Sequence, residues 1–114
     1  MNVNELCNRA EAIERLGGDE SLYANVASLF IAISGDYCAA LEVAMQAADA
    51  AVLRREAHTV KSMLATFSYA AGTALALRLE ELAASGNLDG AQSLTTELVG
   101  AVKRLVGALG SEMA

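Results

Sequence analysis

The chain has 114 residues, of which 54% are hydrophobic and 4% aromatic, and it contains no proline. This length predicts a single domain, 1–114, that buries about two thirds of the surface of the unfolded chain. Abundant alanine and the absence of proline favour closely packed helices over a sheet. The formal net charge of −6 argues against a nucleic-acid partner, because binding phosphates requires a basic surface.

The longest stretch without a charged residue, 62–77, is too short to span a membrane and contains several polar side chains. No basic segment followed by an apolar core and a cleavage site opens the chain, so we expect no signal peptide. Cys7 and Cys38 lie far apart without metal-binding spacing, which predicts two reduced thiols packed in or near helices. These features predict a cytoplasmic protein without membrane contact.

Periodic apolar residues predict helices along the chain. A first helix is expected over 4–16, ended by Gly17 and Gly18, and Asp19 is a natural N-cap for the second. The inward positions of the first helix are expected to be Leu6, Ala10 and Ile13. Those of the second helix are expected to be Leu22, Val26, Leu29, Phe30 and Ile33.

A break or kink is predicted at 34–36, where Ser, Gly and Asp follow one another. The apolar face of a third helix beyond this break carries Tyr37, Leu41, Ala44, Met45 and Ala48. Asp49 is the expected N-cap of a fourth helix over 50–67. After it, a turn or bend is predicted within 69–73.

The remaining part of the chain predicts two more helices. The first should end at Ser85 and Gly86, and Asn87 or Asp89 opens the last helix, whose apolar residues have a heptad-like spacing. The inward residues of the first are expected to be Leu75, Leu79 and Leu82. Because every connection is short, successive helices should be antiparallel neighbours. The sequence therefore predicts an all-α fold, an antiparallel four-helix bundle with an additional short N-terminal helix.

The only histidine of the chain, His58, lies in the fourth predicted helix. At about 100° per residue, this helix has a narrow apolar stripe on the side opposite the histidine. The stripe consists of Leu53, Ala57, Val60, Leu64 and Phe67. The face that carries His58 also carries Ala51, Arg54, Arg55, Lys61, Ser62, Ala65 and Tyr69. The histidine is therefore predicted to be exposed among cations and small side chains, not buried in the core.

An exposed histidine in this setting suits a phosphoryl carrier, since a neutral imidazole nitrogen is a nucleophile near pH 7. Arg54 at i−4, Arg55 at i−3 and Lys61 at i+3 can reach toward the same surface. There they would stabilise the negative charge of a transferring phosphoryl group. The small side chains of Ser62 and Ala65 leave room for the backbone of a partner to approach the imidazole.

The run Ala-His-Thr-Val-Lys-Ser over 57–62 resembles the signature of histidine-containing phosphotransfer (HPt) domains, usually written A-H-x-L-K-G. The resemblance covers nearly the whole chain, because 16–20 is similar to the first turn of the family, 48–49 to its turn before the histidine helix, and 79–80 to a Leu-Glu pair in its next helix. Ser62 replaces the glycine of the family and keeps the site small. Ser68 and Tyr69 stand where the family often has Gly-Ala, which adds bulk near the expected partner surface.

The resemblance implies a histidine phosphotransfer protein that carries a phosphoryl group on His58 between the aspartates of response-regulator receiver domains. His58 would be phosphorylated on the ring nitrogen that faces solvent, with Lys61 stabilising the phosphoryl group. The domain would need no cofactor and have no turnover of its own, since the receiver supplies Mg²⁺ and most catalytic groups. We expect a monomer whose partners are receiver domains and a hybrid sensor kinase. The docking residues are expected to be Arg54, Arg55, Ser62, Ala65 and Tyr69.

Two other interpretations remain open at this point. The chain could be a helical interaction module that binds a signalling partner without phosphoryl transfer, or a domain excised from a larger hybrid sensor kinase. A di-metal bundle is excluded because the chain has one histidine, and a nucleotide-binding kinase because Gly17-Gly18 is only a turn. The dimerisation helix of a sensor kinase is excluded because the acidic residue after its histidine and its nearby proline are missing.

Overall fold

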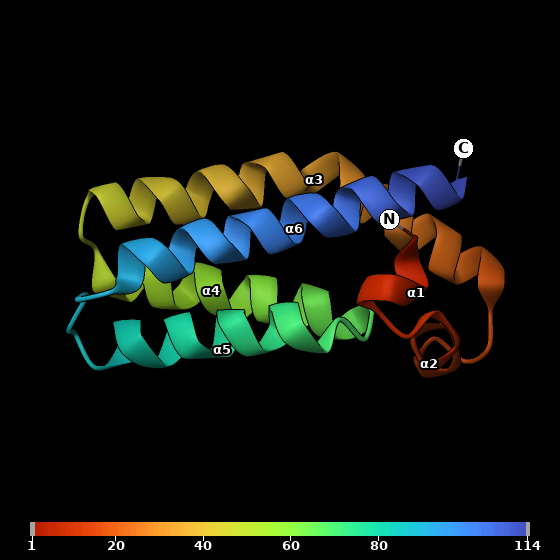
Figure 1. Cartoon of the computed structure of the whole chain (residues 1–114), viewed down its shortest axis with the longest axis horizontal. Coiled ribbons are helices and arrows are strands. Elements are labelled where there is room, and N and C mark those ends of the chain that lie inside the picture. Colours follow the sequence, from red (N-terminus) through yellow and green to blue (C-terminus); the bar gives the residue numbers. More distant parts are fainter. Residues whose placement is uncertain (1, 114) are drawn as a thin grey trace.

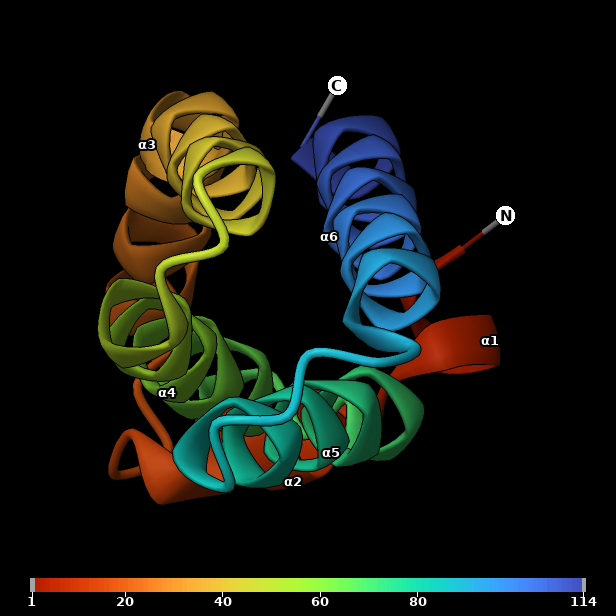
Figure 2. The ribbon, with the colours of Figure 1, turned by 90° about the vertical axis from the view of Figure 1, so that its left-hand side faces the viewer.

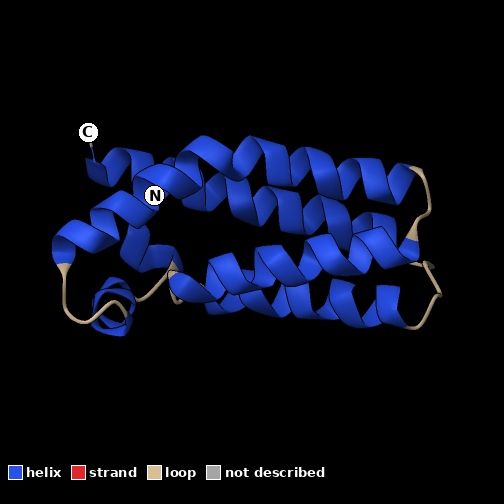
Figure 3. Ribbon diagram, turned by 180° about the vertical axis from the view of Figure 1, so that it is seen from behind, coloured by secondary structure: helices blue, strands red, loops and turns tan. Residues whose placement is uncertain are grey.

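The computed structural model describes residues 2–113, and within this range the chain is helical with no strand. Its helices are α1 (Val3–Leu6), α2 (Arg9–Arg15), α3 (Glu20–Gln46), α4 (Ala50–Thr66), α5 (Ala70–Ala84) and α6 (Ala91–Met113). The four long helices, α3 to α6, run antiparallel in an elongated bundle (Figures 1 and 3), and the molecule measures 40 × 22 × 20 Å. Viewed along the bundle, they surround one common core (Figure 2). The predicted all-α four-helix bundle is confirmed.

The N-terminal segment forms two short helices, so the single helix expected over 4–16 was wrong. The backbone of Cys7 is extended, and the side chain of Asn8 accepts a hydrogen bond from the Glu11 amide, which starts a new helix. An asparagine in this position competes with a continuous helix because its side chain caps the next one. The change of direction exposes Ala10 and buries Ala12 and Ile13, so the expected inward position of Ala10 was also wrong.

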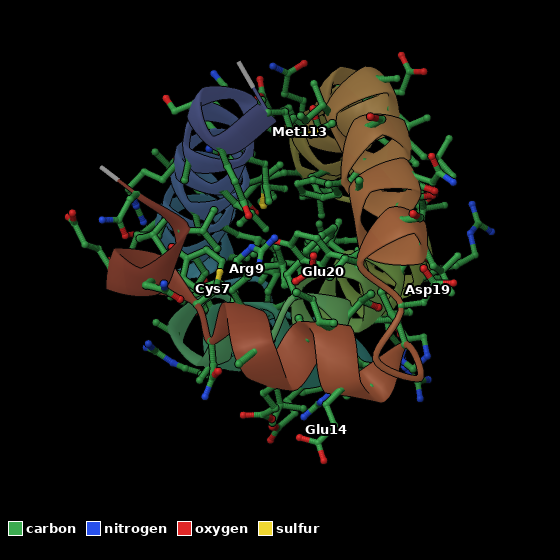
Figure 4. All side chains as sticks on the ribbon, turned by 90° about the vertical axis from the view of Figure 1, so that its right-hand side faces the viewer. Cys7, Arg9, Glu14, Asp19, Glu20 and Met113 are labelled. Carbon is green, nitrogen blue, oxygen red and sulfur yellow. The ribbon has the colours of Figure 1, made fainter. Side chains whose placement is uncertain are left out.

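Helix α2 closes one end of the bundle and is attached to it at both of its ends (Figure 4). Arg9 forms an ion pair with Glu112 near the end of α6, and its guanidinium lies 5.1 Å from the centre of the Tyr23 ring on α3. The Tyr23 hydroxyl donates a hydrogen bond of 3.2 Å to Glu112. At the other end of α2, Arg15 donates a hydrogen bond of 3.1 Å to the Ala65 carbonyl in the last turn of α4. Helix α2 is therefore fixed against α3, α4 and α6.

Helix α3 runs without interruption through 34–36, where a break was expected. The hydroxyl of Ser34 donates to the Ile31 carbonyl one turn earlier, so it does not compete with the helix amides. A glycine within a helix costs about 1 kcal/mol relative to alanine. The burial of Tyr23, Ala27 and Phe30 before Gly35, and of Cys38, Leu41 and Ala44 after it, outweighs that cost.

The core face of α3 also differs from the prediction. Its buried residues are Tyr23, Ala27, Phe30, Ser34, Cys38, Leu41 and Ala44. Of the expected core positions, Leu22 and Leu29 are instead exposed by 42% and 59%. Helix α3 has the length and composition of a membrane-spanning helix, but helices that contribute to the core of soluble bundles pass the same test, and one side of α3 packs in the core. The periodicity predicted the wrong buried residues because α3 is apolar on two sides.

Helix α4 begins and ends where the sequence predicts. The carboxylate of Asp49 accepts from the Val52 amide, and the helix ends one residue before Phe67. Every member of the predicted apolar stripe is buried: Leu53, Ala57, Val60, Leu64 and Phe67. The Phe67 ring packs against Phe30 and Tyr23, with ring centres 5.2 and 6.1 Å apart. The core therefore fixes the rotation of α4 about its axis.

Ala48, expected on an inward face, is an exposed residue in the left-handed conformation of the turn that precedes α4.

The connection from α4 to α5 is tighter than predicted, because the turn lies at 67–69 and α5 already begins at Ala70. Helix α5 ends before Ser85 and Gly86, as expected. Neither Asn87 nor Asp89 is the first residue before α6. They form a turn in which the Asn87 side chain accepts from the Asp89 amide, and Gly90, with a φ of +81°, precedes the helix.

The buried thiol of Cys7 predicts a loss of stability at alkaline pH. Burial, together with the Glu112 carboxylate, raises the pKa of Cys7 from its ordinary 9.0 to about 11. Because the pKa of the thiol is higher in the folded state, ionisation of the thiol favours the unfolded chain. The free energy of unfolding therefore has its full value below pH 9 and falls as the pH rises toward 11. We expect the free energy of unfolding to fall by roughly 1 kcal/mol between pH 8 and 10. In urea unfolding, the free energy of unfolding of Cys7→Ala should fall less between pH 8 and 10 than that of the wild type. An equal fall in both proteins would show that the Cys7 thiol is not the cause.

Candidate functional site

The single histidine lies where the helical geometry predicts. The side chain of His58 is 60% exposed, on the side of α4 opposite the buried stripe. Ser62, one turn further along, is exposed, and Ala65 is half-buried. The imidazole is therefore open to approach from solvent.

The structure adds a residue to this site that the sequence reasoning did not assign a role. Glu80, on α5, accepts a hydrogen bond from His58, with 2.7 Å between Nδ1 and Oε2. Its other oxygen, Oε1, accepts from the Lys61 ammonium at 2.5 Å. A single carboxylate thus joins the histidine and the lysine across two helices. Glu80 is distant in sequence, and only its place in a Leu-Glu pair similar to the HPt family pointed toward it.

The packing of α5 on α4 places the Glu80 carboxylate within hydrogen-bond distance of the imidazole. Gly72 allows the close approach, because a side chain there would meet Leu64 and the Tyr69 ring at 2.9 to 3.1 Å. Further along α5, Leu79 is fully buried in the core. The next residue, Glu80, is therefore turned toward the edge of the helix that faces α4. The buried leucine fixes the position of the carboxylate beside it.

The hydrogen bonds determine which ring nitrogen is reactive. Hydrogen bonds from Lys61 and from His58 hold the pKa of Glu80 below its ordinary value, so the carboxylate is ionised at neutral pH. An ionised carboxylate only accepts hydrogen bonds, so the Nδ1 of a neutral His58 must carry the proton. The lone pair is then on Nε2, at the other side of the ring. The site presents an oriented nitrogen nucleophile.

The cationic side chains predicted around His58 are less closely grouped around the imidazole than expected. Lys61 lies on the histidine side of α4, but its ammonium binds Glu80. Arg55 is exposed and lies 3.7 Å from its neighbour Glu56. Arg54 is exposed and forms no ion pair with any residue in 2–113. Both arginines are exposed, and within 2–113 neither forms a hydrogen bond with the imidazole.

Tyr69 was expected on the exposed face, and this prediction was wrong. Its side chain is only 3% exposed. The helix ends at Thr66, so the 100° periodicity of α4 no longer applies at Tyr69. The turn instead directs the ring between α4 and α5, against the position of Gly72. Tyr69 is a core residue.

No three of the His, Cys, Asp and Glu residues in 2–113 are grouped as a metal site. What the described residues do provide is a helical bundle with an exposed, oriented imidazole on a central helix. This combination provides a nitrogen nucleophile that a partner can reach.

Comparison with known proteins assigns the family. The family model described as Hpt domain matches residues 25–112, and the chain therefore belongs to the HPt family. It is a histidine phosphotransfer protein of phosphorelay signalling, and proteins of this family are phosphocarriers.

The fold is similar to that of a solved relative. The crystal structure of histidine-containing phosphotransfer protein B (HptB) from Pseudomonas aeruginosa PAO1 superimposes with a TM-score of 0.85 at 22% sequence identity. The match covers 94% of this chain and 93% of the other chain. A search of curated protein sequences found no match.

If Glu80 fixes the tautomer of His58, its removal should slow phosphoryl transfer. We expect Glu80→Ala to reduce the rate about tenfold, by analogy with the loss of a partner that orients a metal-binding histidine. The ¹⁵N shifts of the imidazole should change from one tautomer, protonated at Nδ1, to a mixture. Glu81→Ala is the matched control, because Glu81 is an exposed neighbour on the same helix. Equal rates and shifts in both variants would show that Glu80 is only a surface charge.

Proposed function

We propose that His58 is the phosphoryl acceptor and that it exchanges the group with the aspartates of receiver domains. The observation that carries the proposal is the hydrogen bond between Nδ1 and Glu80, because it leaves Nε2 as the free nucleophile on an exposed ring. No other histidine exists in the chain. Membership of the HPt family supports this assignment.

The transfer requires one bond to form and one to break. The Nε2 lone pair attacks the phosphorus of the aspartyl phosphate, and the bond from phosphorus to the aspartate oxygen breaks with release of the carboxylate. The proton on Nδ1 stays in place, and the phosphorylated ring becomes cationic. The ionised Glu80 stabilises this positive charge at 2.7 Å. The reverse reaction returns the group to a second receiver.

Lys61 has a part in the same step. Its ammonium is held by Glu80 in the unphosphorylated protein, one turn from His58. A phosphoryl group on Nε2 provides a second, more highly charged acceptor near this ammonium. Lys61 would then contact the phosphoryl oxygens while the carboxylate continues to orient the ring. We expect Lys61→Ala to slow transfer without abolishing it.

A receiver would dock on the exposed face of α4. Ser62 lies one turn beyond His58, Ala65 follows, and Arg54 and Arg55 lie one turn before His58. We propose, as the resemblance to HPt domains implies, that the receiver supplies Mg²⁺ and most of the catalytic groups. We propose a cytoplasmic, monomeric carrier. A hybrid sensor kinase, as a partner or as the parent of this domain, would supply the phosphoryl group.

The experiment is to incubate the protein with isolated phosphorylated receiver domains and to follow the label. We expect label that is lost in acid and retained in alkali, as for a phosphorus–nitrogen bond on histidine. Alkali-labile label would indicate a different acceptor. No label from any of a broad panel of receivers would favour the alternative, a helical module that binds without transfer.

A further inference from the structure

A groove between α3 and α6 lies on the side of the bundle away from the phosphoryl site. Viewed along the bundle, α3 and α6 form one side, and α4 and α5, which carry His58 and Glu80, form the other (Figure 2). The groove consists of two adjoining hollows of about 400 and 320 Å³. Both hollows are lined by Glu42 on α3 and by Lys103 on α6. The phosphoryl chemistry proposed for His58 does not use this α3/α6 groove.

The α3/α6 groove has an apolar floor and small residues along its walls. The buried residues of the floor are Cys38, Val99 and Val102. Gly35 and Ala39 line the groove from α3, and Gly100 lines it from α6. The distance between packed helices depends on the side chains at their contact, so small residues let another helix approach closely. The shape of the groove therefore suits a second helical surface.

Two glycines on this side of the bundle have no role within the chain itself. Gly35 lies inside α3 and Gly107 inside α6, and a Cβ atom added at either position would meet nothing within 4 Å. Neither has a positive φ, so alanine would fit both positions, and alanine favours a helix more than glycine does. Gly107 is four residues after Lys103, on the same side of α6. Close packing by another molecule would explain why both positions lack a side chain.

The two charged residues of the groove are opposite in sign and unpaired. Glu42 and Lys103 are exposed, and neither forms an ion pair with any residue in 2–113. They line the groove from opposite walls. A two-fold axis that passes between them would place Glu42 of each copy against Lys103 of the other, as an isologous interface requires. The groove is therefore complementary in charge to a second copy of itself.

The spacing along the two helices fits the same axis. Because α3 and α6 are antiparallel, the rotation brings a residue on α3 level with the residue of the second copy that is equally far along the chain from Lys103 as the first is from Glu42. The pairs that meet in this way are Ala39 with Gly100, Gly35 with Thr96, and Gln46 with Gly107. Each pair contains at least one glycine. The two copies can therefore approach closely on both sides of the axis.

The area of contact is near that of a specific dimer. Ala91, at the start of α6, is twelve residues before Lys103, so the two copies overlap over about 36 Å. With a molecular width of 20 Å, the overlap is about 700 Å² on each copy, against about 800 Å² in an interface of standard size. An interface of this size predicts a dissociation constant in the micromolar range. The carrier is then a monomer when dilute.

We propose that the α3/α6 groove is a surface for reversible homodimerisation, in which Glu42 of each copy pairs with Lys103 of the other across a two-fold axis. The inference goes beyond the proposed function and does not depend on it. His58 of each copy lies on the side of the bundle away from the contact, so both histidines would remain open to receivers in the dimer.

The test is an exchange of charges, followed by sedimentation velocity from micromolar to millimolar concentration. The wild type should change from monomer to dimer over this range. Glu42→Lys and Lys103→Glu each bring like charges together, and each should raise the dissociation constant of its homodimer at least about tenfold. An equimolar mixture of the two variants should dimerise as the wild type does, because every contact then joins opposite charges. Arg78→Glu, an exposed residue on α5, is the matched control for Lys103→Glu and should change the dissociation constant less than twofold.

Several results would reject the dimer. A wild type that stays monomeric up to millimolar concentration would overturn it and leave the groove to a helix of another protein. Homodimers of both single variants that are as tight as the wild type would also overturn it. If both variants are weakened and their mixture is not restored, the pairing of Glu42 with Lys103 is wrong. Phosphoryl transfer from a receiver should be unchanged in both variants, and its loss would place the receiver on this face instead of a second copy.

Discussion

The variant His58→Gln should accept no phosphoryl group from a phosphorylated receiver and should keep the stability of the wild type. The loss is expected to be complete, because the chain has no second histidine. Glutamine retains a polar side chain of similar size but has no nucleophilic nitrogen. The side chain is 60% exposed, so the free energy of unfolding should change by no more than about 0.5 kcal/mol. Radiolabel transfer and thermal unfolding measure the two effects separately.

The control for this experiment is the nearby hydroxyl of Ser62. Ser62→Ala removes a possible oxygen nucleophile next to the imidazole and should retain full labelling. Its hydroxyl bonds only to the His58 carbonyl within α4, at 3.3 Å, so the helix should be unaffected. Wild-type labelling of His58→Gln, or its loss in Ser62→Ala, would contradict His58 as the acceptor.

The second large effect is expected from Ser62→Trp. Ser62 is exposed one turn from His58, so a partner that reaches the imidazole must pass over it. A protruding ring at the centre of an interface can cost about 2 kcal/mol or more, which corresponds to a loss of about 30-fold in affinity. Transfer from a receiver should therefore collapse. Phosphorylation by phosphoramidate should largely persist, because a small donor does not need the docking surface.

Ser93→Trp is a matched control, because Ser93 is an exposed serine on a different helix, α6. It should leave receiver transfer unchanged. The corresponding variant Ala65→Trp should also block the receiver, although Ala65 is half-buried and its carbonyl accepts the hydrogen bond from Arg15. Undiminished receiver transfer in both Ser62→Trp and Ala65→Trp would show that the docking face lies elsewhere.

The sequence was a reliable guide where one helix face is apolar and the other polar. Helix α4 is such a case, and its bounds, its buried stripe and the exposure of His58 agree with the periodicity. The periodicity predicted the wrong core face for α3, because Leu22 and Leu29 extend the apolar surface beyond the side that packs in the core. Periodicity gives the spacing of apolar residues, and it cannot decide which of two apolar sides is covered.

Residues typical of turns and helix caps also predicted the helix ends only in part. Asp49 and Ser85-Gly86 mark real helix ends, whereas the Ser-Gly-Asp run at 34–36 does not. The cost of one glycine is small beside the burial of a long apolar face, so packing decided that α3 continues. In the N-terminal segment, Asn8 broke the helix because its side chain could cap a new one.

By itself, the sequence determined the helical class, the bundle and the helix face on which the histidine lies, since these depend on local periodicity and capping. Only the tertiary structure brought Glu80 to 2.7 Å from His58 and buried Tyr69. These features depend on how α2 and α5 pack against α4. Contacts between residues far apart in the chain follow from the fit of core side chains such as Leu79 and from the space at Gly72, which no local pattern encodes.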